Sequence, residues 1–426
     1  MKRLITCASL VAVGVVTVDA QPVGEPSLSK SWSVSAKLRG FYDDNYNTAP
    51  DNPAPGYPYD KGASWGFSVA PSIGANLLRD QTTLNLRYDF DLRWYEARKE
   101  NEIDMYHTAK LNLEHRFNER YRVELYDHFV YADEPSVLES SGQQTTFFRT
   151  QGENLRNYAG IGFFGSFTEA WGYRVGFENT IYDYDEDGAG SRSAILDRME
   201  NKPTIDFRRV LQPNTVALVG YSFSDVDYNA DEYLVLLPPV FQDLSPKSDF
   251  RNSRNHFAFA GLDHAFSTQL DVKLRAGAQI ADYYNAGEDK TAPYADVMFG
   301  YTYAEGSRLQ LGVKTGMIAT DLAVSQDFSG VNLGAQSTTT YLGVSHRLTS
   351  RLNGQVRGTW QALNYFGESS YDDEWDNYYT VDVGLVYTIN TYVALEGGYL
   401  WDRLDSDIDN RSYSRNRGYL GVRATY

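Results

Sequence analysis

The chain of 426 residues contains one cysteine, Cys7, which excludes a fold held together by disulfides. Beyond its N-terminus it lacks any apolar run of the roughly 18 residues that a membrane-spanning helix needs. Positive charge is scarce, because 39 Lys and Arg stand against 56 Asp and Glu, giving a net charge of −17. Such an acidic chain is poorly suited to bind nucleic acid, and 14% aromatic residues are too many for a disordered chain.

Signatures of catalysis and metal binding are missing as well. The chain has no Gly-x-Ser-x-Gly, His-Glu-x-x-His or phosphate-loop pattern. His115, His264 and His346 are expected near turns on the lipid side, and they share no motif with a serine. The aspartates of 183–187 lack the glutamate that completes an EF-hand loop. We therefore expect no enzyme activity, no cofactor and no metal site.

The N-terminus has the layout of a secretory signal. Two basic residues precede an apolar stretch, and small residues lead to an expected cleavage after Ala20. Residues 1–20 are therefore predicted to be a signal peptide. A membrane anchor is the alternative, which the shortness of the apolar stretch disfavours. Cleavage would remove Cys7, which suits an oxidising compartment.

The remaining sequence alternates between apolar and polar residues, which is the period of a β-strand with one apolar face. From Leu84 to Trp94 every even-numbered residue is apolar and every odd-numbered residue is polar or charged. Segments of 10–13 residues are long for a soluble sandwich and suit tilted strands that cross a bilayer. We count eighteen segments, with centres expected near residues 37, 70, 90, 111, 126, 161, 177, 203, 220, 260, 276, 299, 314, 342, 357, 383, 398 and 420.

The connections alternate strictly between short and long, eight short links separating nine long ones. In lipid every backbone group needs an internal partner, so the strands must close into a ring. The sequence therefore predicts an all-β fold, a transmembrane antiparallel up-and-down β-barrel of about 18 strands in the bacterial outer membrane, with short periplasmic turns and long extracellular loops. Residues 21–31 would be a short periplasmic segment and 32–426 the barrel. The count could differ by two.

Aromatic residues crowd the predicted strand ends, where their rings would lie at headgroup level. One expected belt contains Trp65, Trp94, Tyr131, Tyr379 and Trp401, and the other contains Trp32, Tyr121, Tyr173, Tyr387 and Tyr426. The last strand ends on an aromatic residue, Tyr426, as does the C-terminal signal that barrel assembly machinery reads. Membrane lipid and this machinery are the expected partners. Whether the protein forms a homo-oligomer is left open by the sequence.

Two segments fit the alternation poorly. Asp127 falls on the apparent lipid face of its strand. A later strand can be read in either register, because Phe257 and Phe259 compete with Ala258 and Ala260 for that face. We expect a bulge or another irregularity in each strand.

Several local patterns resemble the second putative beta-barrel porin family of bacterial outer membranes. They are Tyr42-Asp43-Asp44-Asn45, the stretch from Asp127 to Pro135, Arg156-Asn157, Leu196-Asp197-Arg198, Gly261-Leu262-Asp263-His264 and Asp282-Tyr283. The resemblance covers most of the chain after residue 20 and implies an outer-membrane barrel. Some members of that family look associated with exopolysaccharide export, and the resemblance carries over no catalytic residue.

The alternation also places basic residues on the inner face. The predicted pore-lining residues are Arg39, Arg87, Arg93, Lys110, Arg122, Arg174, Arg208, Arg275, Lys314, Arg357 and Arg417. A net basic wall favours a pore that prefers anions or acidic saccharides. The alternative is a wall of Arg–carboxylate pairs that stiffens the barrel, and the two can coexist.

The long loop at 226–252 contains an apolar run that is unfavourable in water. A lumen formed by eighteen strands is too wide for wall side chains alone to fill. We expect the run to fold inward as a constriction, while packing across the rim or contact with a neighbouring protomer stay open. The residues of this predicted constriction are Tyr233, Leu234, Leu236, Leu237, Pro238, Pro239 and Phe241.

These features predict a porin-like channel for passive or selective diffusion of small solutes, with anions or saccharides as candidate substrates. One alternative is an outer-membrane component of exopolysaccharide export or attachment. Another is a structural barrel without transport.

Overall fold

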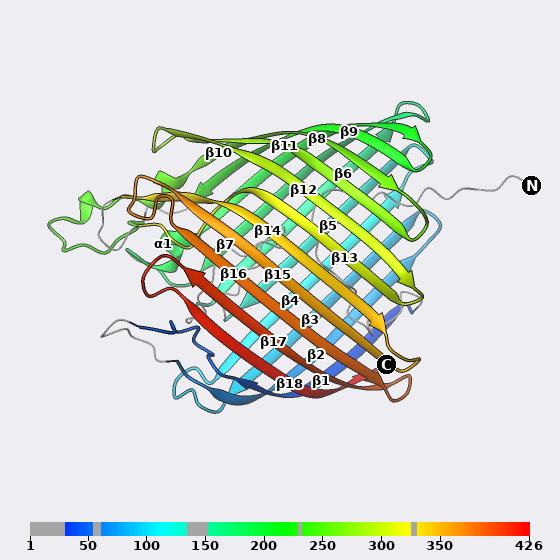
Figure 1. The fold of residues 1–426 in the computed structure, drawn as a ribbon, viewed down its shortest axis with the longest axis horizontal. Coiled ribbons are helices and arrows are strands. Elements are labelled where there is room, and N and C mark those ends of the chain that lie inside the picture. The colour runs from blue at the N-terminus through cyan, green and yellow to red at the C-terminus, as the bar shows by residue number, and fades with distance from the viewer. Residues whose placement is uncertain (1–29, 54–60, 134–151, 229–231, 325–329) are drawn as a thin grey trace, which may run out of the picture.

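The computed structural model describes residues 30–53, 61–133, 152–228, 232–324 and 330–426. The predicted signal peptide, and residues 21–29 of the predicted periplasmic segment, lie outside the described residues. Eighteen antiparallel strands form one sheet in which each strand pairs with the next, and β18 pairs with β1 to close the ring (Figure 1). The predicted barrel and strand count are confirmed, and all eighteen expected centres lie within strands.

The strands are 12 to 17 residues long and nearly all of the ordered structure is β. Their bounds are β1 Trp32–Asp43, β2 Ser64–Leu78, β3 Thr82–Tyr95, β4 Ile103–Arg116, β5 Tyr121–Ala132, β6 Asn154–Ser166, β7 Trp171–Tyr184, β8 Arg198–Gln212, β9 Thr215–Tyr228, β10 Ser253–Ala265, β11 Leu270–Tyr283, β12 Glu288–Ala304, β13 Ser307–Ile318, β14 Asn332–Arg347, β15 Leu352–Gly367, β16 Trp375–Thr388, β17 Val393–Ser406 and β18 Tyr413–Thr425. Short helices occur only in connections of the described chain: α1 Arg192–Leu196, η1 Gln242–Leu244 and η2 Ser248–Arg251.

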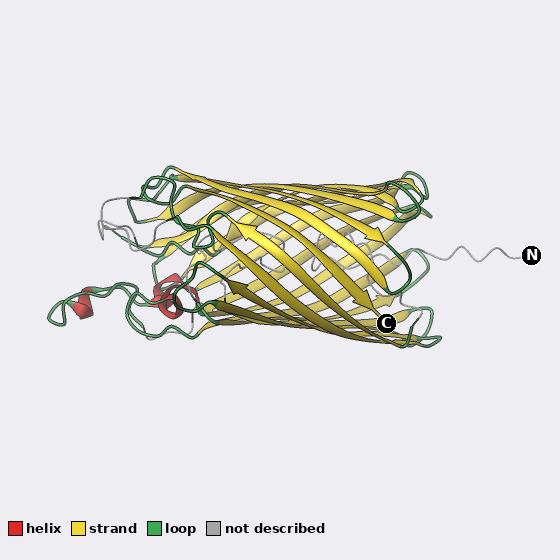
Figure 2. Ribbon diagram, turned by 90° about the horizontal axis from the view of Figure 1, so that it is seen from below, coloured by secondary structure: helices red, strands yellow, loops and turns green. Residues whose placement is uncertain are grey.

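The two ends of the barrel differ. Tight turns, such as the two residues between β8 and β9, lie at the end where the chain finishes, and we call this the short-turn end (Figure 2). The rings of Trp32 and Tyr426 are 5.4 Å apart there. The helices lie at the opposite, long-loop end. No helix of the described residues has the length and apolar character to span a membrane.

The strand alternation separates two chemically different faces. On β1 the large apolar side chains Trp32, Val34 and Leu38 are exposed on the outer face, while Lys37 and Arg39 alternate with them on the inner face. Exposed apolar residues recur on the outer face of other strands, as Leu420 and Val422 do on β18. An apolar exterior around a polar interior is the arrangement of a barrel that spans a bilayer.

The two strands that fit the alternation poorly are regular, so the expectation of a bulge in each is wrong. Register shifts occur instead at Val210/Gln212, Thr302/Ala304 and Asn332/Gly334. Asp127 remains on the outer face of β5, directly between Leu111 of β4 and Ala159 of β6.

The register of β10 is also settled. Ala258 lies opposite the exposed Tyr221 and thus faces outward, which turns Phe257 and Phe259 toward the lumen. The sequence could not decide this, because small and large apolar residues alternate along this strand.

The sheet has one seam, between β12 and β13. Their ladder ends at Ala295 opposite Thr315, although β12 continues for seven more residues toward the long-loop end. A continued register would place Pro293 opposite Met317. Because proline has no N–H, it cannot donate to the ladder at that position.

A side chain takes the place of the missing strand partner. Met317 N donates to Gln279 Oε1 at 2.8 Å, and Gln279 Nε2 is 3.5 Å from Met317 O. The carboxamide of Gln279 thus acts as a substitute peptide group for β13. Gln279 belongs to β11, beyond β12, so it can reach Met317 only across the lumen side of β12.

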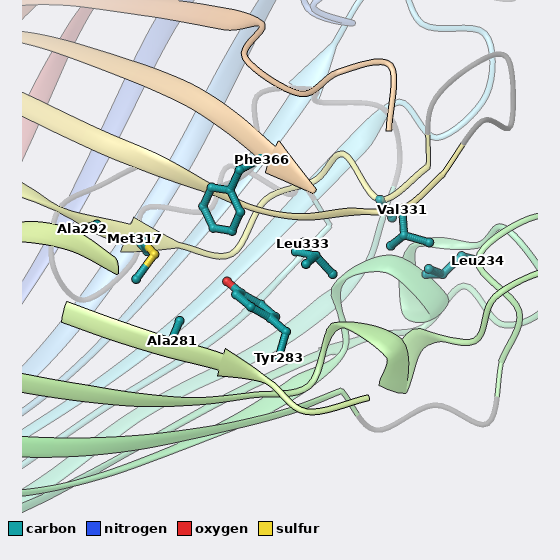
Figure 3. Close-up of a cluster of buried hydrophobic side chains, with 9 residues drawn as sticks. Leu234, Ala281, Tyr283, Ala292, Met317, Val331, Leu333 and Phe366 are labelled. Atoms are coloured by element: carbon teal, nitrogen blue, oxygen red, sulfur yellow. The ribbon is translucent and has the colours of Figure 1, made fainter. Parts of the chain in front are cut away.

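The long-loop ends of β13 to β15 are consequently tucked inside the wall formed by β11 and β12. Met317, Leu333 and Phe366 pack with Ala281 and Tyr283 in a buried cluster (Figure 3). The ring centroids of Tyr283 and Phe366 are 5.9 Å apart. The overlap covers the unpaired part of β13 with apolar side chains and narrows the mouth of the barrel.

We expect Gln279→Leu to release the tucked end of β13. The substitution leaves the peptide group of Met317 without its partner, at a cost of about 1–3 kcal/mol. Hydrogen exchange at Met317 should therefore accelerate without loss of the barrel. Gln310→Leu is the matched control, since Gln310 faces inward on β13 and contacts Met298 Sδ rather than a backbone group. Equal exchange at Met317 in the two variants would contradict the role assigned to Gln279.

Candidate functional site in the lumen

The predicted pore-lining residues all occupy inner-face positions of their strands. Seven of the eleven form ion pairs with carboxylates. These pairs are Arg39–Glu396 at 2.6 Å, Arg87–Asp89 at 2.7 Å, Arg93–Asp91 at 3.0 Å, Arg122–Glu124 at 2.9 Å, Arg174–Glu178 at 3.8 Å, Arg208–Asp206 at 2.6 Å and Arg275–Asp263 at 2.7 Å. For these seven the geometry fits the alternative of a stiffened wall, because most of their charge is neutralised locally.

The other four differ. Lys110 has no carboxylate within ion-pair range among the described residues. Lys314, Arg357 and Arg417 have interaction partners. The pore-lining role of all eleven stays a prediction.

The predicted constriction run does not enter the lumen. Leu234 is buried in the cluster under the loops, but Leu236, Val240 and Phe241 are 74%, 86% and 54% exposed. The segment containing η1 extends away from the barrel at the long-loop end (Figures 1 and 2). The structure therefore places Tyr233–Phe241 mainly outside the barrel, in a protruding finger.

Local hydrogen bonds explain why this segment holds its own shape. Gln242 Oε1 accepts from Leu237 N and Gln242 Nε2 donates to Val235 O, each at 2.8 Å. Tyr233 Oη donates to Asp243 Oδ1 at 2.8 Å. These hydrogen bonds and two prolines fold the apolar run into a compact turn. Such local hydrogen bonds cannot be predicted from an apolar composition alone.

The segment that does enter the barrel follows β13. Arg251, fully buried on η2, donates to Thr320 O at 2.7 Å and to Ile195 O at 2.8 Å. Arg411, from the connection between β17 and β18, pairs with the adjacent Asp321 at 2.7 Å. Two arginines from widely separated loops thus hold one short stretch, 320–321, between them.

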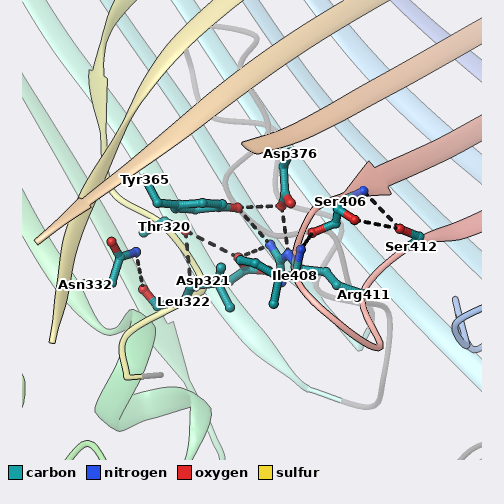
Figure 4. A network of polar contacts seen from close by, with 10 residues as sticks. All are labelled: Thr320, Asp321, Leu322, Asn332, Tyr365, Asp376, Ser406, Ile408, Arg411 and Ser412. Carbon is teal, nitrogen blue, oxygen red and sulfur yellow. Dashed lines mark hydrogen bonds and ion pairs between the residues drawn. The ribbon is translucent and has the colours of Figure 1, made fainter. Parts of the chain in front are cut away.

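Arg411 is the centre of a buried polar network (Figure 4). Its Nε donates to Asp376 Oδ2 at 2.7 Å, and Tyr365 Oη donates to the same carboxylate oxygen at 2.5 Å. Burial opposes the charge of Arg411, but Asp321, Tyr365 and Asp376 outweigh it and raise its pKa well above the ordinary value. Arg411 therefore stays charged and keeps the stretch 320–321 in place.

Below this stretch lies a cavity of about 220 Å³ against the inner faces of β7 to β13. Its lining combines four basic residues, three acidic residues, aromatic rings, hydroxyls and amides. The charged members are Arg174, Lys202, Arg251, Lys314, Glu178, Glu200 and Asp296. Ile318 and Leu333 of the tucked strands, with Ala319 directly after β13, complete the cavity, so the seam and the cavity form one site.

Most of this site could not be located from the sequence. Arg174 and Lys314 were predicted from strand alternation, but Arg251 lies in a loop where no alternation exists. Its signal in the sequence is weak: a basic residue in a long loop, two positions before a strand. Likewise, the sequence shows Gln279 only as one of many inward-facing polar residues. Its role becomes visible only in the structure, where it contacts Met317.

The family model described as Putative beta-barrel porin 2 matches residues 320–426. This is 107 of the 426 residues, from the stretch held by the two arginines to the end of β18. Comparison with curated proteins gives no match. The resemblance noted in the sequence is thereby found for the last quarter of the chain.

Solved structures that are similar include several outer-membrane proteins, all at low identity. OccAB4 of Acinetobacter baumannii is 11% identical, with 94% of this chain and 100% of that chain covered and a TM-score of 0.45. OpdK of Pseudomonas aeruginosa is 10% identical, with 93% and 99% covered and a TM-score of 0.43. A BenF-like porin of Pseudomonas fluorescens Pf-5 is 10% identical, with 93% and 99% covered and a TM-score of 0.46.

The closed barrel with an apolar exterior and the porin family match define a porin-like barrel of the bacterial outer membrane. The outer face of the barrel is therefore surrounded by membrane lipid. The short-turn end is the periplasmic end and the long-loop end is the extracellular end, as the connection lengths predict.

The extracellular loop that carries α1 contains a pH-sensitive carboxyl group. Asp197 accepts hydrogen bonds from Ser193 Oγ at 2.7 Å and Tyr184 N at 2.8 Å, and burial raises its pKa from 3.8 to about 6. The folded loop binds this proton more tightly than the unfolded chain does. Its contribution to stability is therefore largest below about pH 4 and falls as the pH rises through about 6.

We expect Asp197→Asn to remove this dependence, because the amide does not ionise. Protection of the Tyr184 amide from hydrogen exchange, corrected for the intrinsic rate, should fall between pH 4 and pH 7 in the native protein and stay level in the variant. A parallel fall in both proteins would show that another group controls the loop.

Proposed function

We propose that the protein is an outer-membrane channel in which small anionic solutes diffuse along the cavity beneath the tucked strands. The observation that carries this proposal is that basic residues without an ion-pair partner among the described residues outnumber such acidic residues in the cavity. Lys202 has no carboxylate within ion-pair range among the described residues, and its ammonium contacts only the ring of Phe257, at 5.0 Å. Glu200 and Glu178, in contrast, pair with Arg198 and Arg174.

Arg251 adds a second basic group that has no carboxylate within ion-pair range among the described residues. Its guanidinium donates to two backbone carbonyls and lies 4.7 Å from the ring centroid of Tyr228, but the buried Nε has no partner among the described residues. A buried charge that lacks an opposite charge is unfavourable, and an anion in the cavity would relieve this cost. Positive groups thus lie both at the extracellular mouth and on the wall.

The charge of Asp296 works against this preference. It lines the same cavity, and no ion pair of Asp296 is present among the described residues. Two unpaired basic groups against one unpaired acidic group leave a modest positive excess. We therefore expect a selectivity for anions that is moderate rather than complete.

The test is reversal potential in a planar bilayer that holds the purified protein across a potassium chloride gradient. We expect stable open steps and a reversal potential of the sign for anion preference. Lys202→Glu should reverse or abolish that preference, because it changes the local charge by two units. Lys99→Glu makes the same change on an exposed loop outside the cavity and should leave the sign unchanged.

Two results would overturn the proposal. A folded protein without open steps would indicate a plugged barrel and would shift the function to export or a structural role. A reversal potential that is equally altered by Lys202→Glu and Lys99→Glu would show that the general surface charge, and not the cavity, sets the selectivity.

The stretch 320–321 should control conductance. Arg411→Met removes the charge that holds Asp321 while retaining much of the side-chain volume, so we expect larger or more variable open steps. Arg403→Met is the control, because Arg403 is half-exposed and its one ion pair within the described part of the chain is with the exposed Asp405 at the rim. Identical step sizes in the two variants would rule out a restricting role for this stretch.

A further inference from the structure

Phe257 is an exception to the chemistry of the inner wall. An apolar ring on the lumen face of a barrel strand is unfavourable where that face meets water. Phe257 is nevertheless only partly buried, on the face that turns toward the cavity. This residue is also one of those that made the register of β10 ambiguous in the sequence.

Three other inner-face aromatic rings, those of Tyr126, Phe259 and Tyr341, have a structural explanation that Phe257 lacks. They lie over glycines on neighbouring strands, where the missing side chain leaves room for a ring. A Cβ atom on Gly160, Gly220 or Gly312 would lie within 2.5 Å of the ring of Tyr126, Phe259 or Tyr341, respectively. No described glycine has the ring of Phe257 among its nearest neighbours.

Phe257 belongs to a small aromatic group with a cation at its edge. The ring centroid of Tyr294 is 5.6 Å from that of Phe257 and 5.8 Å from that of Phe259. The ammonium of Lys202 is 5.0 Å from the centroid of Phe257. An apolar platform and a positive charge are thus adjacent in one cavity.

Hydrogen-bonding groups surround this platform. Asn255 and Gln279 line the cavity, and Gln279 Nε2 donates to Asn255 Oδ1 at 3.1 Å. Ser224 and Ser253 contribute hydroxyls. The hydroxyl of Tyr294 has no hydrogen-bond partner among the described residues, so it is available to a ligand.

We propose that this group is a binding subsite for an acidic saccharide unit, such as a uronate. The apolar face of the sugar ring stacks on Phe257, its carboxylate pairs with Lys202, and its hydroxyls bond the amides and hydroxyls around the platform. A simple inorganic anion needs no flat apolar surface, and a neutral sugar needs no ammonium group. This inference rests on the proposed channel function and narrows its substrate class.

The experiment measures block of the open channel by a trimer of galacturonate, with maltotriose as the neutral saccharide and potassium acetate as the small anion. We expect the galacturonate trimer to interrupt the current at concentrations where the other two do not. Phe257→Leu keeps the apolar volume but removes the flat ring, and it should weaken block roughly fivefold. Lys202→Gln should weaken block by the acidic trimer as well.

Tyr106→Leu is the matched control, because Tyr106 is an inner-face aromatic residue outside the cavity, next to Arg93. It should leave the block unchanged. Equilibrium binding of the same trimer to the detergent-solubilised full chain, measured by calorimetry, provides a readout that does not need an open channel.

The outcomes separate the two proposals. Open, anion-selective steps without block or calorimetric binding would overturn the saccharide subsite and leave the channel intact. Calorimetric binding that Phe257→Leu weakens, in a barrel without open steps, would overturn diffusion through the channel and support the subsite. Equal affinity for the galacturonate trimer and maltotriose would overturn the role of Lys202.

Discussion

The need to pair every backbone N–H and C=O inside a bilayer governs this structure. It is met by the ladder between β1 and β18, which runs from Ser35 opposite Thr425 to Asp43 opposite Arg417 and removes both free edges of the sheet. The same requirement makes the seam informative. Where Pro293 interrupts the ladder near the extracellular end, the freed peptide group of Met317 is paired by Gln279 and covered by apolar side chains. The seam thus shapes the mouth of the barrel while the peptide group of Met317 stays paired.

Charge inside the barrel serves two purposes. Most wall arginines are neutralised by carboxylates close to them in the sheet, often on the same strand, as Arg87 is by Asp89. Such pairs hold long side chains against the wall and leave little net field. Lys202 and Arg251 are different, because each contacts an aromatic ring and neither has a carboxylate partner among the described residues. Selectivity in this barrel would therefore depend on a few spare charges rather than on the total number of arginines.

The sequence predicted the strands well because their two faces meet different surroundings. Lipid on one side and a polar lumen on the other impose a period of two on nearly every strand, so the strand positions, the inner-face arginines and the alternating connections can be read directly. The failures share another cause. The tucked ends of β13 to β15 depend on contacts among Pro293, Gln279 and Met317, which belong to three different strands. Local sequence patterns do not predict contacts between residues of different strands. The run 233–241 was expected to fold inward because its composition is apolar, with rim packing left open, whereas Leu236, Val240 and Phe241 are exposed.

The substitute pairing at the seam also makes the residue types at positions 279 and 293 depend on each other. A residue with an N–H at position 293 would give β12 the donor it lacks and would let it compete with Gln279 for Met317. Conversely, once the ladder between β12 and β13 continues past Ala295, the side chain of Gln279 is no longer needed to pair with Met317. Pro293 and Gln279 should accordingly change together during evolution, and lineages that have lost one should have lost the other and carry a wider, untucked mouth.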